Sequence, residues 1–139
     1  LDGSYIQVNT GDAVLDTARW YHLAGVYDGE EIRLYVDGQL ISRRAASGDR
    51  RTNGLPLIVG ADVDENGNAM SPFDGYIDEV RLSTGAVYTE NFEPARRLTA
   101  TSDTRLLLHM DEAQGPFLYD ASGKGAHATI RGEAAVVTP

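Results

Sequence analysis

The chain has 139 residues, of which 42% are hydrophobic and 24% are charged. Its 12 basic and 21 acidic residues give a formal net charge of −9, which disfavours a nucleic-acid binder or a polybasic membrane-surface module, because both need a basic surface. Cysteine is absent, which excludes disulfides, thiolate nucleophiles and cysteine-ligated metal sites. No apolar run reaches the length of about 18 residues that would predict a membrane-spanning helix.

The first half of the chain consists of short apolar stretches separated by glycine, Asp and Asn, which predicts an all-β protein with many turns. The clearest strand alternates, with Ile32, Leu34 and Val36 on one face. The dipeptide Asp37-Gly38 follows it and predicts a two-residue hairpin. The expected strands of this half cover residues 5–8, 20–27, 31–36 and 40–44.

The second half continues the pattern after a polar, arginine-rich loop at residues 45–53. We expect an acidic loop at residues 62–71 and an irregular segment at residues 84–97, which contains Pro94. Many short strands without a long amphipathic helix predict a β-sandwich or jelly roll. The expected strands of this half cover residues 57–60, 76–82, 106–110, 117–119, 128–131 and 134–137.

One carboxylate in the strand expected at residues 76–82 stands out. Alternation places Asp78 on the same face as Tyr76, Val80 and Leu82, which is the more apolar face. A carboxylate in such a place needs a partner, which can be a hydrogen-bond donor, an arginine or a metal ion.

Three blocks together resemble a known family. They are WYHLAGVYDG at residues 20–29, LYVDG at residues 34–38 and FDGYIDEVRL at residues 73–82. Their order and spacing resemble the laminin-G-like, concanavalin A-like jelly-roll domains of bacterial extracellular proteins. The resemblance implies an antiparallel jelly-roll β-sandwich in a secreted or cell-surface protein.

The end of the chain also resembles this family, but in an unusual order. Residues 106–112 and 120–125 look like the opening strand and loop of such domains, which normally come first. We therefore expect a single domain over residues 1–139, in which residues 103–139 resemble the opening strands. Three explanations stay open: a fragment that begins inside one domain, a chain that ends inside the next repeat, and a permuted domain whose tail returns to the sheet.

The resemblance also implies a structural calcium ion supported by Asp78. Calcium takes about six to eight oxygen ligands, and carbonyls of residues 109–111 together with the Asp111 and Asp120 carboxylates would complete the shell. The predicted metal ligands are therefore Asp78, Asp111 and Asp120. In the alternative, Asp78 is satisfied by backbone N–H groups or an arginine. We interpret residues 120–125 as a turn, with a loop beside the calcium ion as the alternative.

A second acidic stretch mimics a calcium loop without completing it. Residues 62–68 match the first half of an EF-hand loop, but its twelfth position is Phe73 instead of the required glutamate. We expect a solvated acidic turn there, with a weak second calcium site as the alternative.

Ligand recognition is expected to depend on aromatic rings and arginines, because rings stack on sugars and guanidinium groups bind acidic glycans. Trp20, which lies in a family strand, is expected to pack in the core. His22 and His109 are expected to be hydrogen-bonded structural residues. The candidate ligand-binding residues are Tyr21, Arg43, Arg44, Arg50, Arg51 and Tyr88.

No catalytic motif is present. Glycosidases need two facing carboxylates, whereas the adjacent pairs Asp78-Glu79 and Asp111-Glu112 would diverge in a strand. We expect a non-catalytic extracellular module that binds a glycan or a cell-surface protein. The alternatives are a purely structural or interaction module and a fragment of a glycoside hydrolase. Exposed sheet edges predict an oligomer or contact with a neighbouring domain.

Overall fold

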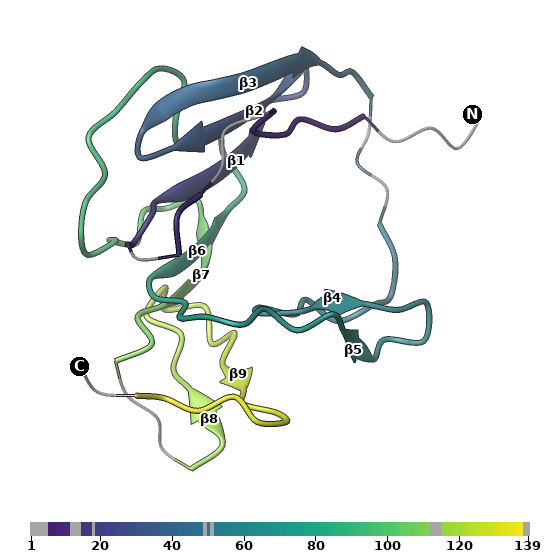
Figure 1. Cartoon of the computed structure of the whole chain (residues 1–139), viewed down its shortest axis with the longest axis vertical. Coiled ribbons are helices and arrows are strands. Elements are labelled where there is room, and N and C mark those ends of the chain that lie inside the picture. Colours follow the sequence, from purple (N-terminus) through teal and green to yellow (C-terminus); the bar gives the residue numbers. More distant parts are fainter. Residues whose placement is uncertain are drawn as a thin grey trace. The chain divides into compact units, whose positions relative to one another are not determined.

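The computed structural model describes residues 6–11, 15–17, 19–48, 50, 52–111 and 115–137 (Figure 1). These residues contain strands and turns and no helix, so the all-β prediction is confirmed. Within this described part, no helix could span a lipid bilayer. The chain divides into two compact units, of which unit 1 comprises Leu1–Asp49 and Ser83–Arg96, and unit 2 comprises Arg50–Leu82 and Arg97–Pro139.

Unit 1 contains an antiparallel sheet of three strands in the order β1-β2-β3. The expected strand at residues 31–36 and the hairpin after it are confirmed. Asp37 and Gly38 have φ angles of 48° and 74°, the left-handed conformation that a two-residue hairpin with a right-handed twist requires. The three strands are β1 (Leu23–Tyr27), β2 (Glu31–Val36) and β3 (Gln39–Ala45).

Aromatic rings hold the irregular segment of unit 1 against its sheet. Tyr35 on β2 is fully buried, and its ring centroid lies 5.5 Å from that of Phe92. Phe92 also donates its backbone N–H to the carbonyl of Gly38 over 2.9 Å. A Cβ atom on Gly38 would lie 1.8 Å from the Phe92 carbonyl oxygen, so this close approach requires glycine.

Unit 2 contains three two-stranded pairs, and two of them are hairpins of two residues a side. The β4–β5 hairpin lies in the stretch where only an acidic loop was expected, because Asp64 organises a tight turn between the two strands. The strands are β4 (Asp62–Val63), β5 (Ala69–Met70), β6 (Val80–Ser83), β7 (Thr104–Leu108), β8 (Phe117–Leu118) and β9 (Ala128–Thr129).

The core of unit 2 is built around β7. Leu106, Leu107 and Leu108 expose 7%, 2% and 1% of their surface, so the predicted buried strand is confirmed over these residues. Burial on both faces fits the continuous apolar run, because an amphipathic strand would alternate. Ala121 donates its backbone N–H to the Leu107 carbonyl over 2.8 Å, which places the 120–125 loop beside β7.

Several predicted strands are wrong. Residues 57–60 form no strand, and Leu57 is 67% exposed. The strand expected at residues 76–82 begins only at Val80, because Glu79 has a φ of 53° and leaves the extended conformation. Residues 134–137 also form no strand, and neither do residues 6–8. Tyr5, which was expected to open the first strand, lies outside the described residues.

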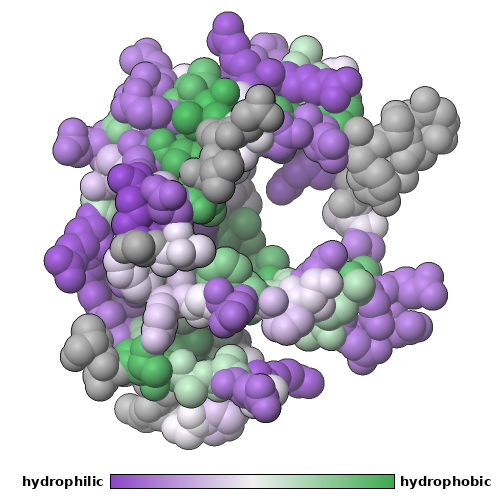
Figure 2. Space-filling view, viewed as in Figure 1, coloured by the Kyte–Doolittle hydropathy of each residue, from purple (hydrophilic) through white to green (hydrophobic). Residues whose placement is uncertain are grey.

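Both units expose large apolar side chains. Figure 2 shows hydrophobic residues among hydrophilic ones on the face that it draws. Trp20 in unit 1 is 65% exposed, and Tyr76 and Phe73 in unit 2 are 71% and 60% exposed. Trp20 therefore does not pack in the core as expected. Exposed apolar surface often marks sites where a ligand or a partner binds.

Candidate functional site

Three carboxylates gather in unit 2 at the ends of the paired strands β6 and β7. Asp78, Glu79 and Asp111 each offer an oxygen atom, and these atoms lie within 4.8 Å of one another. Asp78 and Glu79 precede β6, whereas Asp111 follows β7. The structure thus brings together two of the three predicted metal ligands and adds Glu79. Asp120 does not belong to this carboxylate cluster.

Two left-handed residues shape the carboxylate cluster. Glu79 has a φ of 53° before β6, and Met110 has a φ of 61° after β7. Residues other than glycine rarely adopt this backbone conformation, and those that do are concentrated at functional sites. As a result Asp78 is exposed, while the Glu79 side chain is only 10% exposed. The expectation that Asp78 lies on the apolar face is therefore wrong, because alternation ends at Glu79.

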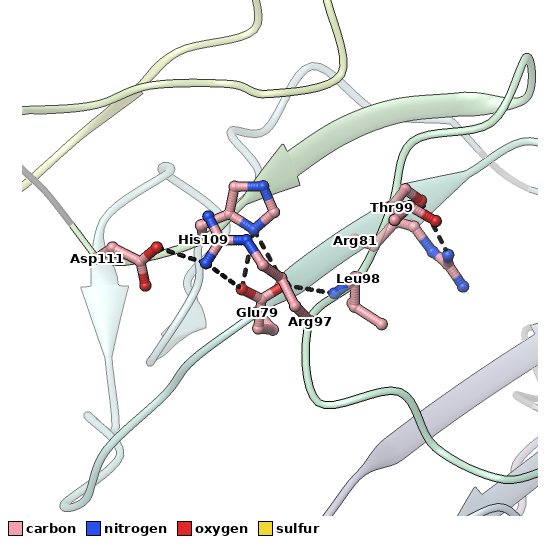
Figure 3. Close-up of polar contacts among 7 residues, drawn as sticks. All are labelled: Glu79, Arg81, Arg97, Leu98, Thr99, His109 and Asp111. Atoms are coloured by element: carbon pink, nitrogen blue, oxygen red, sulfur yellow. Dashed lines mark hydrogen bonds and ion pairs between the residues drawn. The ribbon is translucent and has the colours of Figure 1, made fainter.

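Glu79 is held by two hydrogen-bond donors (Figure 3). The backbone N–H of Leu98 donates to Glu79 Oε2 over 2.8 Å, and His109 Nδ1 lies 2.8 Å from Oε1 and 3.0 Å from Oε2. Since a carboxylate only accepts, the hydrogen bond places a proton on Nδ1 of His109. This contact agrees with the expectation that His109 is hydrogen-bonded.

Arg97 supplies the positive charge of the carboxylate cluster. Its Nη1 atom lies 2.6 Å from Asp111 Oδ2 and 3.6 Å from Glu79 Oε1 (Figure 3). The hydrogen bond to Asp111 raises the pKa of Arg97 above its ordinary value and outweighs the opposing effect of burial, and the charges of Asp111, Glu79 and Asp78 act in the same direction as the hydrogen bond. The guanidinium group therefore interacts with all three carboxylates.

A cavity of about 270 Å³ lies next to Arg97 and His109. Asp111, Tyr119 and Asp120 also line it, so two of the predicted metal ligands face one hollow. The cavity is mixed in character, because a guanidinium, an imidazole, two carboxylates and an aromatic ring contribute to its wall.

Asp120 has a different role from the carboxylate cluster. It is 8% exposed and accepts backbone N–H groups of Leu107 at 2.9 Å, Ser122 at 2.9 Å and Ala126 at 3.0 Å, besides the Ser122 hydroxyl at 2.7 Å. Burial raises the pKa of Asp120, but these hydrogen bonds outweigh burial and hold the pKa well below its ordinary value. Both oxygens are thus engaged in tying the 120–125 loop to β7.

The EF-hand-like stretch also uses its central carboxylate for a turn. Asp64 accepts the backbone N–H groups of Asn66 at 2.9 Å and Asn68 at 2.8 Å, and the Asn68 side-chain amide at 3.1 Å. These bonds lower the pKa of Asp64, with the Asn68 backbone contributing most. The geometry is that of a solvated acidic turn in the β4–β5 hairpin.

The predicted arginine cluster is divided between the two units. Arg43 and Arg44 lie exposed on β3 of unit 1, and as neighbours in a strand they point to opposite faces. Arg50 is exposed in unit 2. Arg51 lies outside the described residues.

The two predicted tyrosines have structural contacts. The Tyr88 ring stacks on Phe92, with centroids 3.6 Å apart and planes inclined by 5°. The Tyr21 hydroxyl accepts the backbone N–H of Asp16 over 2.8 Å, and the Arg19 guanidinium lies 4.2 Å from the Tyr21 ring centroid. Tyr88 thus stacks within unit 1, whereas Tyr21 and Arg19 flank the exposed Trp20 in the sequence.

The carboxylate cluster fits calcium in the chemistry of its donors, because calcium prefers carboxylate and carbonyl oxygens. Sequence reasoning missed Glu79 and Arg97. The alternation rule gave no signal for Glu79, since its left-handed backbone cannot be read from neighbouring residue types. Arg97 lies in an irregular segment, and only tertiary contacts bring it to Asp111.

Comparison with known proteins agrees with the family resemblance. A laminin-G-type family model described as the concanavalin A-like lectin/glucanases superfamily matches residues 2–91. No curated protein and no solved structure matches the chain. The matched region contains Asp78 and Glu79, whereas Arg97, His109 and Asp111 lie beyond it.

Proposed function

Since the chain belongs to the concanavalin A-like lectin/glucanase superfamily, we propose that it is a non-catalytic, extracellular module that binds a glycan or a cell-surface partner. A binding role fits the family as a whole, and laminin-G-like domains are typically extracellular. Carbohydrate recognition and a secreted or cell-surface location are the specific parts of the proposal.

The observation that carries the glycan proposal is an exposed aromatic group in unit 1. Trp20 is 65% exposed and is followed in the chain by Tyr21, whose ring lies 4.2 Å from the Arg19 guanidinium. Arg19 also forms an ion pair with Asp37, which restrains its orientation. An exposed indole can stack on the C–H face of a sugar, and polar groups beside it can bind hydroxyl or acidic substituents.

The non-catalytic part of the proposal rests on how the carboxylates are engaged. A glycosidase needs one carboxyl group as a general acid and a second as base or nucleophile, on either side of the scissile bond. In unit 2, Glu79 is bound by Leu98 and His109, and Asp111 is bound by Arg97. These contacts support a structural role for the carboxylates over a hydrolytic one.

We further propose that the carboxylate cluster holds a structural calcium ion. Asp78, Glu79 and Asp111 would supply oxygen ligands, and the ion would tie the chain before β6 to the chain after β7. This contribution would be to stability, because a ligand that binds only the folded state stabilises it.

The glycan proposal is tested by binding of the whole chain to a glycan array, followed by titration of a positive glycan. Trp20→Ala should weaken binding by about tenfold or more, as is common for a central tryptophan of a binding surface. Phe117→Ala is the matched control, because Phe117 is also exposed, at 45%, but lies in unit 2. Equal affinity of Trp20→Ala and the wild type would reject Trp20 as the glycan-binding residue. Cleavage of an array glycan would reject the non-catalytic role.

A further inference from the structure

We propose that Arg97 is a built-in competitor of calcium at the carboxylate cluster, and this inference rests on the proposed calcium site. The guanidinium group and a calcium ion would need the same oxygen atoms. Arg97 would therefore set the calcium concentration at which the site fills.

The contacts of Arg97 are those that a bound cation would make. Its Nη1 atom lies 2.6 Å from Asp111 Oδ2 and 3.6 Å from Glu79 Oε1, and it also experiences the charge of Asp78. A calcium ion binds oxygen at about 2.3–2.6 Å, and an N–H donor cannot serve as a ligand. The Asp111 oxygen therefore cannot coordinate calcium while it holds Arg97.

The charges of the carboxylate cluster attract a divalent ion more strongly than a guanidinium group. Three carboxylates carry three negative charges, and Arg97 offsets one of them. A divalent ion would offset two of these charges, so the carboxylates that attract the guanidinium group would also attract a calcium ion. Replacement of Arg97 by a neutral residue removes the competitor and leaves every carboxylate in place.

The structure lets Arg97 leave without disturbing the backbone. The Arg97 side chain is 59% exposed, so it can rotate into water. The next residue, Leu98, is 7% exposed and donates its N–H to Glu79 over 2.8 Å. Leu98 thus anchors the chain, and only the side chain of Arg97 has to move.

The experiment is calorimetric titration of calcium into the whole chain for the wild type, Arg97→Gln and Arg96→Gln, at pH 7.5 and constant ionic strength. Arg96→Gln is the matched control, because it removes the same charge from the neighbouring exposed position. We expect Arg97→Gln to bind calcium about tenfold more tightly than the other two, a difference of about 1.4 kcal/mol. Asp111→Asn added to Arg97→Gln should abolish the gain.

The possible results separate the two proposals. If Arg97→Gln and Arg96→Gln bind with equal affinity, Arg97 is not a competitor, but the calcium site stands. If only Arg97→Gln binds calcium, the competition is supported, and the proposal that the wild type holds a calcium ion is rejected. If no variant binds, both proposals fail. Should Arg97→Gln not fold, the Arg97 side-chain NMR signals of the wild type provide the test: calcium must shift them towards those of a solvated arginine, and unchanged signals at saturation overturn the competition.

Discussion

Leu107 on β7 donates its backbone N–H to the Asp120 carboxylate over 2.9 Å, while its carbonyl accepts the backbone N–H of Ala121 over 2.8 Å. Asp120 accepts further N–H groups from Ser122 and Ala126. One carboxylate thereby closes the 120–125 loop onto β7 and forms part of the wall of the cavity beside Arg97.

Replacement of Asp120 should therefore destabilise the protein. Asp120→Asn introduces a donor opposite N–H groups, and we expect it to lower the free energy of unfolding by about 1–3 kcal/mol, which is the usual cost of a buried unsatisfied donor. Urea unfolding followed by circular dichroism measures the change. Asp74→Asn, at an exposed position, should leave the urea midpoint unchanged. An unchanged midpoint for Asp120→Asn would show that the loop bonds contribute nothing.

Asp120 also predicts a dependence of stability on pH. Because its pKa is depressed in the folded state, the carboxylate stabilises the fold fully above the unfolded-state pKa of about 4. This stabilisation is lost as the pH falls towards the lower folded-state pKa. Urea midpoints should thus be similar at pH 7 and pH 5 and should decrease below about pH 4.

The acid-dependent loss should be smaller in Asp120→Asn than in the wild type, but it should not vanish. Asp28 contributes to the same effect, because the backbone N–H groups of Glu31 and Glu30 outweigh burial and lower its pKa to about 2, with a further contribution from Arg33. An equal loss of stability in the wild type and the variant at pH 3 would contradict the role of Asp120.

Gly38→Ala should be among the most damaging substitutions in unit 1. The added Cβ atom would meet the Phe92 carbonyl oxygen at 1.8 Å, and the φ of 74° is unfavourable for alanine by about 1–2 kcal/mol. Gly123→Ala is the matched control, because its φ is 77° but no atom lies within 4 Å of the new Cβ. Thermal unfolding should show a larger loss for Gly38→Ala by about 2 kcal/mol or more. Equal losses would mean that the backbone of Phe92 moves away at little cost.

Calcium should raise the thermal midpoint of the wild type relative to EDTA. At a calcium concentration of about one hundred times the dissociation constant, the stabilisation is about 2.7 kcal/mol. Asp78→Asn combined with Asp111→Asn should abolish the shift, and magnesium in place of calcium controls for ionic strength. An unchanged melt up to saturating calcium would reject the structural calcium ion.

The edges of the unit 1 sheet predict association in solution. Among the described strands, β1 and β3 occupy the edges of this sheet, and Leu23 on β1 is 57% exposed. We expect the mass by light scattering to increase with concentration, and Leu23→Lys to restore a monomer. A monomeric mass for the wild type at every concentration would argue against edge pairing.

The sequence determined those elements whose signals are local. The strand at residues 31–36 and the Asp37-Gly38 hairpin follow from alternation and turn chemistry within eight residues. The leucine run of β7 is also a local signal, because a continuous apolar run predicts a strand that is buried on both faces. The family resemblance was also readable, because its blocks lie within continuous strands and turns.

Only the tertiary structure decided which side chains form the candidate site. Residues 57–60 have the composition of a buried strand but pair with no strand among the residues that the structure describes, and a strand requires a partner. The left-handed backbone of Glu79 reverses which carboxylate is buried, and Arg97 reaches Asp111 from an irregular segment. These features depend on contacts between residues distant in sequence, and such contacts leave no periodic pattern in the residues themselves.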